Sequence, residues 1–255
     1  MSIERSSAVG LVTEMVRFSL EFHLNRQNLF FLFADYVRCH APLARSQLFQ
    51  DLLVLFLTGD LKHGYFVEFG ATDGVGLSNT YLLEKKFDWN GILAEPARSW
   101  HQALKTNRSA KIDTRCVWSE TGKKLDFSES EVGEFSTINE FWSQDTNIRK
   151  KTNSYSVETV SLNDLLQGHQ APEKIDYMSL DTEGSELDIL AYFDFKKYDI
   201  KIVTVEHNLV EPNRSMIYDI MLKNGYRRIF EPLSRFDDWY VKHSFLEERF
   251  PGIQI

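Results

Sequence analysis

The feature of this sequence best suited to chemistry is an acidic residue near the end of an apolar run, followed at once by a glycine-rich turn. Residues 65–69 read Tyr-Phe-Val-Glu-Phe, and the turn carries Gly70, Gly74 and Gly76. Glycine adopts backbone angles closed to other residues and lets the main chain approach a ligand, while the next helix N-terminus presents free N–H groups. A strand that delivers Glu68 into such a turn is typical of a site for a nucleotide-like cofactor.

A second acidic residue, Glu95, ends the next apolar run in Gly-Ile-Leu-Ala-Glu-Pro. Doubly wound folds place a carboxylate at about this distance, where it accepts hydrogen bonds from ribose hydroxyls. The dinucleotide fingerprint needs a third glycine five residues after Gly74, and the chain has Asn79 there. The spacing therefore fits NAD poorly and resembles the first motif of class I S-adenosylmethionine-dependent methyltransferases. A structural turn without a ligand is the alternative, and Glu95 argues against it.

A third group of acids follows the run Tyr-Met-Ser-Leu, where Asp181 and Glu183 precede Gly184, Ser185 and Glu186. Open α/β sheets bind ligands at the carboxyl ends of their strands, so we expect Asp181 to face a cleft. Along an extended end, Asp181 and Glu183 would point the same way, whereas Ser185 and Glu186 equally suit the cap of the next helix. A carboxylate beside a buried strand needs a partner such as a cation, an amine or a hydroxyl.

Glu206 and His207 end another apolar run, Val-Thr-Val. A histidine at a strand end can accept a proton near neutral pH, and Glu206 could orient it. A histidine held by loop carbonyls is an equally good interpretation. Asp181, Glu183, Glu206 and His207 could also hold a divalent metal, although no spacing in the sequence demands one.

Apolar strands alternate with helical segments from residue 65 onward, which is typical of a mostly parallel sheet covered by helices on both faces. The fold class predicted is α/β, Rossmann-like, with a seven-stranded sheet. The expected strands are residues 65–69, 91–94, 114–118, 175–180, 202–206, 226–230 and 238–241. The expected helices are residues 78–86, 100–105, 161–167, 185–193 and 214–224.

The segment 128–156 is polar and weakly periodic, and we interpret it as an active-site loop or lid, or equally as a surface insertion. Its aromatic residues would suit stacking on a sugar ring or an apolar ring system, and core packing explains them nearly as well. These aromatic residues are Phe135, Phe141, Trp142 and Tyr155.

Composition narrows the function classes. The 255 residues carry a net charge of −8 with no run of lysine or arginine, which argues against nucleic acid as a partner. Cys39 and Cys116 are far apart and lack metal-ligand spacing, so a reducing, cytoplasmic location is expected. No signal peptide is expected, because Glu14, Arg17, Glu21 and Arg26 interrupt the N-terminal segment. No transmembrane segment is expected, because the apolar run at residues 29–34 is too short to cross a bilayer.

The first part of the chain forms a predicted helical extension, residues 1–60, ahead of the cofactor-binding domain at residues 61–255. Apolar residues recur near helical spacing at Val12, Met15, Val16, Leu20, Leu24 and Phe31. Such a face favours packing onto the core, while homo-oligomerisation and contact with a membrane surface stay open.

The ordered set of motifs resembles the FkbM-type methyltransferases, class I enzymes that use S-adenosylmethionine and often methylate hydroxyl groups on sugars or polyketide-derived rings. The resemblance spans most of the chain but not its first 44 residues. The matching segments are residues 45–51, 64–71, 78–80, 89–96, 179–186, 206–207 and 237–240. Where many relatives have Asp-Val-Glu-Gly-Ala-Glu, residues 181–186 read Asp-Thr-Glu-Gly-Ser-Glu, which keeps the acids.

The resemblance implies that S-adenosylmethionine is the cofactor and that a hydroxyl of a small molecule or glycan is the acceptor. It places Glu95 on the ribose hydroxyls, and His207 or Asp181 as the base, with a divalent ion as the mechanistic alternative. The residues expected near the cofactor are Glu68, Gly70, Ala71, Gly74, Ser78, Asn79, Glu95, Trp118, Ser119 and Asp181.

Two other functions stay open. An NAD-dependent oxidoreductase would require a different glycine fingerprint. A catalytically idle relative could use the same crevice as a binding or assembly module, with the N-terminal helices as the interface.

Overall fold

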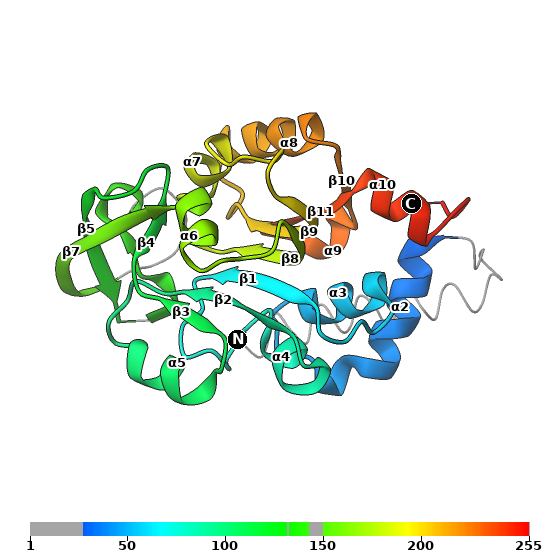
Figure 1. The fold of residues 1–255 in the computed structure, drawn as a ribbon, viewed down its shortest axis with the longest axis horizontal. Helices are drawn as coiled ribbons and strands as arrows, with labels where there is room; N and C mark the ends of the chain where they lie inside the picture. Colours follow the sequence, from blue (N-terminus) through cyan, green and yellow to red (C-terminus); the bar gives the residue numbers. More distant parts are fainter. Residues whose placement is uncertain (1–27, 132, 143–149, 255) are drawn as a thin grey trace.

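A seven-stranded sheet forms the centre of the protein in the computed structural model, which describes residues 28–131, 133–142 and 150–254 (Figure 1). The strand order is β10-β11-β9-β8-β1-β2-β3. Only β11 runs antiparallel to its neighbours β9 and β10, and the predicted mostly parallel seven-stranded sheet is therefore confirmed. The bounds are β1 Tyr65–Phe69, β2 Asn90–Ala94, β3 Lys111–Asp113, β8 Lys174–Leu180, β9 Asp199–Glu206, β10 Tyr226–Ile229 and β11 Asp237–Lys242.

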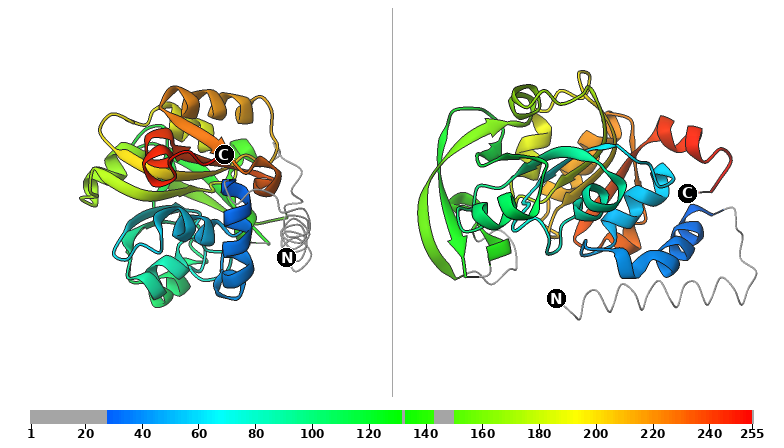
Figure 2. Two further views of the ribbon diagram at one scale, coloured as in Figure 1. Left: turned by 90° about the vertical axis from the view of Figure 1, so that its right-hand side faces the viewer. Right: turned by 60° about the horizontal axis from the view of Figure 1, so that its bottom comes forward.

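Two hydrophobic cores cover the two faces of this sheet, because both faces of its central strands are apolar. Along β1, Phe66 enters one core and Val67 the other, as the two-residue period of a strand requires. Helices α2 to α5 contribute to the first core, and α6 to α8 to the second (Figures 1 and 2). The helices are α2 Leu29–His40, α3 Gln50–Thr58, α4 Tyr81–Phe87, α5 His101–Asn107, α6 Leu162–Gly168, α7 Glu186–Ala191, α8 Asn213–Lys223, α9 Glu231–Ser234 and α10 His243–Arg249.

A second, four-stranded sheet in the order β4-β7-β5-β6 corrects two predictions. The expected strand 114–118 does not belong to the main sheet, since its residues Cys116–Trp118 form β4 and pair with β7. The main-sheet strand β3 lies just before it, at Lys111–Asp113. The segment 128–156, predicted as a loop, contains paired strands. The strands β5 (Lys124–Ser130) and β7 (Lys151–Ser161) pair antiparallel, and β6 (Thr137–Ile138) pairs with β5. Short 3₁₀ turns lie at Ala41–Leu43, Gly133–Phe135 and Asn139–Phe141.

A small apolar core explains why this second sheet forms despite its polar sequence. Phe127 and Tyr155 face each other across β5 and β7, with ring centroids 5.9 Å apart. Cys116, Ile138 and Phe141 complete the same core. Cross-strand packing of this kind stabilises a sheet without long apolar runs, and these runs are the signal that a sequence scan detects.

The described part of the N-terminal region packs onto the main sheet. Helix α2 begins after Asn28, whose side chain accepts a hydrogen bond from the Phe30 N–H at 2.9 Å. Phe33 on α2 stacks on Phe230 with ring centroids 5.3 Å apart. The predicted apolar face at positions 12–24 lies outside the described residues. No helix in the described ranges is long and apolar enough to cross a membrane, and homo-oligomerisation and a cytoplasmic location stay predictions.

Candidate functional site

A cavity of about 570 Å³ opens at the carboxyl ends of β1, β2, β8 and β9, which is a volume typical of small-molecule sites. One end is apolar, with Cys116, Val117, Phe127 and Ile138 in its wall. The other end carries carboxyl groups from the strand ends. The acids that line the cavity are Glu68, Glu95, Asp181, Glu183, Glu206 and Asp237, and the described lining residues include no lysine, arginine or histidine.

Glu68 lines this cavity, but its carboxylate is bound by the chain itself. It accepts hydrogen bonds from the Asn79 N–H at 2.7 Å and from the Ser78 hydroxyl at 3.1 Å. The Thr80 hydroxyl donates a further, short hydrogen bond. The side chain therefore fixes the segment that follows the glycine turn, and it offers few free lone pairs to a ligand.

Arg108 is the cation that balances this region, and sequence reasoning missed it. Its side chain is fully buried and lies 3.6 Å from the Glu68 carboxylate and 2.7 Å from that of Glu84. It also donates to the Gly74 carbonyl oxygen at 3.1 Å and to the Thr80 hydroxyl at 2.8 Å. Nothing in the local sequence marks Arg108, which is 40 residues from Glu68, because only the folded chain brings the two together.

The turn glycines differ in what they do. Gly70 has φ +72° and a Cβ there would lie 2.1 Å from the Asp181 carbonyl oxygen, so the two strand ends approach closely only because this residue is glycine. Gly74 has φ +78° and packs against the Arg108 and Leu104 side chains. At Gly76, in contrast, a Cβ would meet nothing closer than 3.7 Å.

Glu95 is held at the end of β2 by two backbone N–H groups. Thr72 donates to it at 2.8 Å and Ala97 at 2.7 Å. Burial raises the pKa of Glu95 to about 7, against the lowering effect of these two hydrogen bonds. The carboxyl group keeps acceptor positions free on the side of the cavity and therefore suits vicinal hydroxyls.

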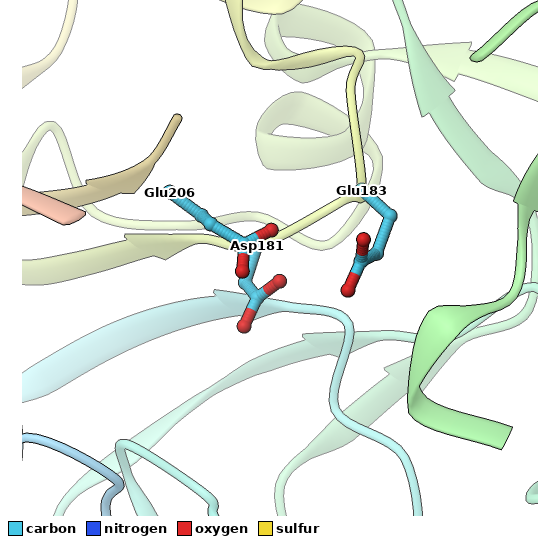
Figure 3. Close-up of side chains that lie close together, drawn as sticks. All are labelled: Asp181, Glu183 and Glu206. Carbon is cyan, nitrogen blue, oxygen red and sulfur yellow. The ribbon is translucent and has the colours of Figure 1, made fainter. Parts of the chain in front are cut away.

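Three carboxylates gather at the ends of β8 and β9, as Figure 3 shows. Asp181, Glu183 and Glu206 each place an oxygen within 4.8 Å of the others. Burial raises the pKa of Asp181 and of Glu206, and the negative charge of Asp181 adds to the rise at Glu206. Among the described atoms, Oε2 of Glu206 has no hydrogen-bond partner. Such a group can take up a proton or bind a cation.

Comparison with known proteins decides the family. The model of the methyltransferase FkbM domain matches residues 68–228, more than half of the chain. The chain belongs to the FkbM methyltransferase family. Among solved structures, the crystal structure of precorrin-6y C5,15-methyltransferase from Geobacter metallireducens is similar, with a TM-score of 0.42 and 6% identity over 78% of this chain and 88% of that chain. No curated protein matches the chain.

In this FkbM methyltransferase, His207 does not line the cavity, in contrast to the predicted strand-end acids Glu68, Glu95 and Asp181. Its Nδ1 accepts a hydrogen bond from the Leu209 N–H at 3.0 Å, and its Nε2 lies 3.6 Å from Oδ1 of Asp238. Burial alone would raise the pKa of Asp238, but His207, Arg214 and Arg228 outweigh burial and hold this pKa below the usual range. The imidazole thus lies beside the buried Asp238 carboxylate and its two arginines rather than in the cavity wall.

The remaining predicted cofactor residues fall into two groups. Gly70, Ser78 and Asn79 line the cavity, and the Asn79 side-chain amide donates to the Ser179 hydroxyl at 2.8 Å. Oδ1 of Asn79 is buried and has no partner among the described residues. Ala71, Gly74, Trp118 and Ser119 are not among the described lining residues, and the neighbouring Cys116 and Val117 provide the wall instead.

Two further residues of the FkbM methyltransferase site were not predicted as functional. Gln50, at the start of α3, donates from Nε2 to Oδ2 of Asp237 at 2.7 Å, and both side chains line the cavity. Burial, followed by the charge of Asp181, raises the pKa of Asp237 to about 7. Asp237 begins its strand rather than ends it, so the search for acids after strands passed over it.

Proposed function

We propose that this methyltransferase uses S-adenosylmethionine to methylate a hydroxyl group of a small molecule, such as a sugar, a glycan or a natural product. The observation that carries the proposal is that Glu95, the turn at Gly70 and Asp181 line one cavity of about 570 Å³. Carboxylates at the ends of adjacent parallel strands around a glycine turn form the arrangement by which doubly wound folds bind nucleosides.

Different parts of the cavity wall would contact different parts of this cofactor. Glu95 would accept hydrogen bonds from both ribose hydroxyls, and the adenine would lie against the apolar wall at Val117, Phe127 and Ile138. Asn79, with its unpartnered Oδ1, faces the methionine end. Glu68 supports this end through Ser78 and Thr80 rather than by direct contact.

Methyl transfer from a sulfonium is an in-line displacement, so the protein chiefly aligns the acceptor oxygen, the methyl group and sulfur. An alcohol must also lose its proton. Asp181 is the proposed base because it lines the cavity and its raised pKa lies nearer the operating pH than that of an ordinary carboxylate. His207, the other base predicted from the sequence, does not line the cavity and is not the base in this proposal.

The charge of the site also limits the acceptor. The donor cofactor carries a positive sulfonium, which the surrounding carboxylates attract. An acceptor with a phosphate or carboxylate group would be repelled by the same acids. The acceptor proposed is therefore neutral, with a hydroxyl group beside further polar groups that can bond to Gln50 and Asp237.

A thermal-shift titration with S-adenosylhomocysteine, with NAD in parallel, tests the cofactor. A ligand at one hundred times its dissociation constant adds about 2.7 kcal/mol to the free energy of unfolding. Wild-type protein and the exposed-site control Glu120→Gln should be stabilised by S-adenosylhomocysteine alone, and Glu95→Gln much less. Stabilisation by NAD instead would support an oxidoreductase, and no response to either would favour an idle binding module.

Transfer of a radiolabelled methyl group to hydroxyl compounds and to their matched amine analogues then tests the acceptor. Labelling of the alcohols is expected. Labelling confined to the amines would contradict O-methylation while leaving the cofactor assignment intact.

A further inference from the structure

The three strand-end carboxylates of Figure 3 differ from the other acids of the cavity. Glu68 is bound by Ser78, Asn79 and Thr80, and Glu95 by two backbone N–H groups. Asp181, Glu183 and Glu206 each place a carboxylate oxygen within 4.8 Å of the other two. Negatively charged carboxylates at this separation repel one another unless a positive charge lies between them.

The backbone is shaped to bring these groups together. Glu183 adopts a left-handed conformation with φ +60°, which is uncommon for a residue with a side chain and costs of order 1–3 kcal/mol. The Thr137 hydroxyl donates to the Glu183 carbonyl oxygen at 2.8 Å and holds the turn against the second sheet. Glu186 accepts from the Thr182 N–H at 2.7 Å and fixes the other side. The turn that carries Glu183 is therefore held in place by Thr137 on one side and by Glu186 on the other.

Glu206 supplies the independent sign of a ligand. Its residue surface is 8% exposed, it lines the cavity, and its Oε2 has no hydrogen-bond partner among the described residues. Burying an unpaired carboxylate oxygen is costly, so such atoms are expected to have a partner. The described residues that line the cavity provide no basic side chain to fill this role.

We propose that Asp181, Glu183 and Glu206 together bind one divalent cation of the kind that prefers oxygen ligands, such as Mg²⁺ or Mn²⁺. Carboxylate oxygens are the ligands such ions favour, and an ion of this type keeps positions for water and substrate oxygens. His207 is not one of the proposed ligands, because its Nδ1 accepts from the Leu209 N–H and its Nε2 lies 3.6 Å from Oδ1 of Asp238.

This inference rests on the proposed function for its purpose. When bound, such an ion lowers the pKa of a hydroxyl that coordinates it. Asp181 would then bind the ion through one carboxylate oxygen and accept the hydroxyl proton on the other. An acceptor with two neighbouring oxygens would be preferred, because both can reach the ion.

Isothermal titration of MnCl₂ into the full chain, freed of metal by chelator and without cofactor, tests the site. One Mn²⁺ per chain is expected. Glu183→Gln and Glu206→Gln, which keep side-chain size, should each weaken Mn²⁺ binding at least about tenfold. Glu95→Gln, which removes a carboxylate elsewhere in the same cavity, should change the affinity less than about threefold.

The outcomes separate this inference from the proposed function. S-adenosylhomocysteine stabilisation without Mn²⁺ binding would overturn the metal site and leave the methyltransferase proposal standing, with the sulfonium as the cation that the acids meet. Mn²⁺ binding without S-adenosylhomocysteine binding would do the reverse. Equal weakening in all three variants would also overturn the assignment, since it would show a general effect of charge.

Discussion

The two acidic regions of the cavity differ in how their charge is balanced. Around Glu68, a buried cation and several donors satisfy the carboxylate, and the ligands of this region are parts of the chain itself. Around Asp181 and Glu206, three carboxylates meet with an oxygen left unpaired. Burial and sequence position are similar in the two places. The carboxylate of Glu68, which the chain satisfies, is thus structural, whereas Glu206 keeps an unpaired oxygen for a ligand.

The largest expected effect comes from a substitution in the region around Asp181 and Glu206, where one carboxylate oxygen has no partner among the described residues. Asp181→Asn should lower kcat about 10²–10⁴-fold, because the acceptor hydroxyl then loses its proton acceptor or the ligand of its ion. S-adenosylhomocysteine affinity should change only a few-fold. Steady-state kinetics and titration calorimetry give the two values. His207→Gln is the control with another strand-end residue, and an equal loss of kcat in it would contradict the placement of the base at Asp181.

In the region around Glu68, where the chain satisfies the carboxylate, a substitution should change the free energy of unfolding. Arg108→Met leaves the buried Glu68 without its cation and Glu84 with Lys85 as its remaining ion-pair partner, and it should lower the free energy of unfolding by about 3–5 kcal/mol. Urea denaturation measures this change. The exposed pair of Arg38 and Asp35 provides the control, since Arg38→Met should cost at most about 1 kcal/mol. Similar losses in both variants would show that Arg108 does not balance the acids.

Two glycines of the turn that follows β1, Gly74 and Gly76, allow a finer comparison within the region around Glu68. Gly74→Ala places a Cβ 2.5 Å from Cγ of Arg108 at a positive φ and should cost about 1–3 kcal/mol. In Gly76→Ala the added Cβ makes only ordinary contacts, the nearest at 3.7 Å, and stability should change by less than about 0.5 kcal/mol. Thermal unfolding of the two variants side by side provides the test, and a larger loss at Gly76 would contradict the observed backbone.

A pH series tests the ribose end. Glu95 has its pKa raised to about 7 in the folded chain, so its carboxylate forms as the pH rises through 7. S-adenosylhomocysteine should therefore bind about tenfold more tightly at pH 8 than at pH 6. The contribution of the same group to apo stability has the opposite sign, because it is present below the unfolded carboxyl pKa and lost as the pH rises through 7. In Glu95→Gln this part of the pH dependence should disappear; an unchanged profile would assign it to Asp181 or Asp237.

Much of the scaffold was predictable, because β1 and β8 are apolar runs whose periodicity and flanking residues mark their ends. The acids after these runs could be placed at one sheet edge by the rules of parallel sheets, and the FkbM family assignment is confirmed. The second sheet was not predictable, since its stability comes from cross-strand contacts such as that of Phe127 with Tyr155. Arg108 was not predicted because its partners are distant in sequence, and Asp237 was not predicted because it begins a strand, whereas the predicted acids follow strands.

The register of β11 has a consequence for how the chain tolerates insertions and deletions. Two adjacent acids begin this strand, and side-chain alternation sends Asp237 into the cavity with Gln50 and Asp238 to Arg214 and Arg228. The backbone pairing of Asp237 with Glu206 fixes which acid goes where. If one residue were added to or removed from the turn before β11 and the strand slipped by one position, Asp238 would face the cavity side and Asp237 the side of the arginines. The turn that follows α9 is thus intolerant of length change, even though it contributes only Phe236 to the cavity wall.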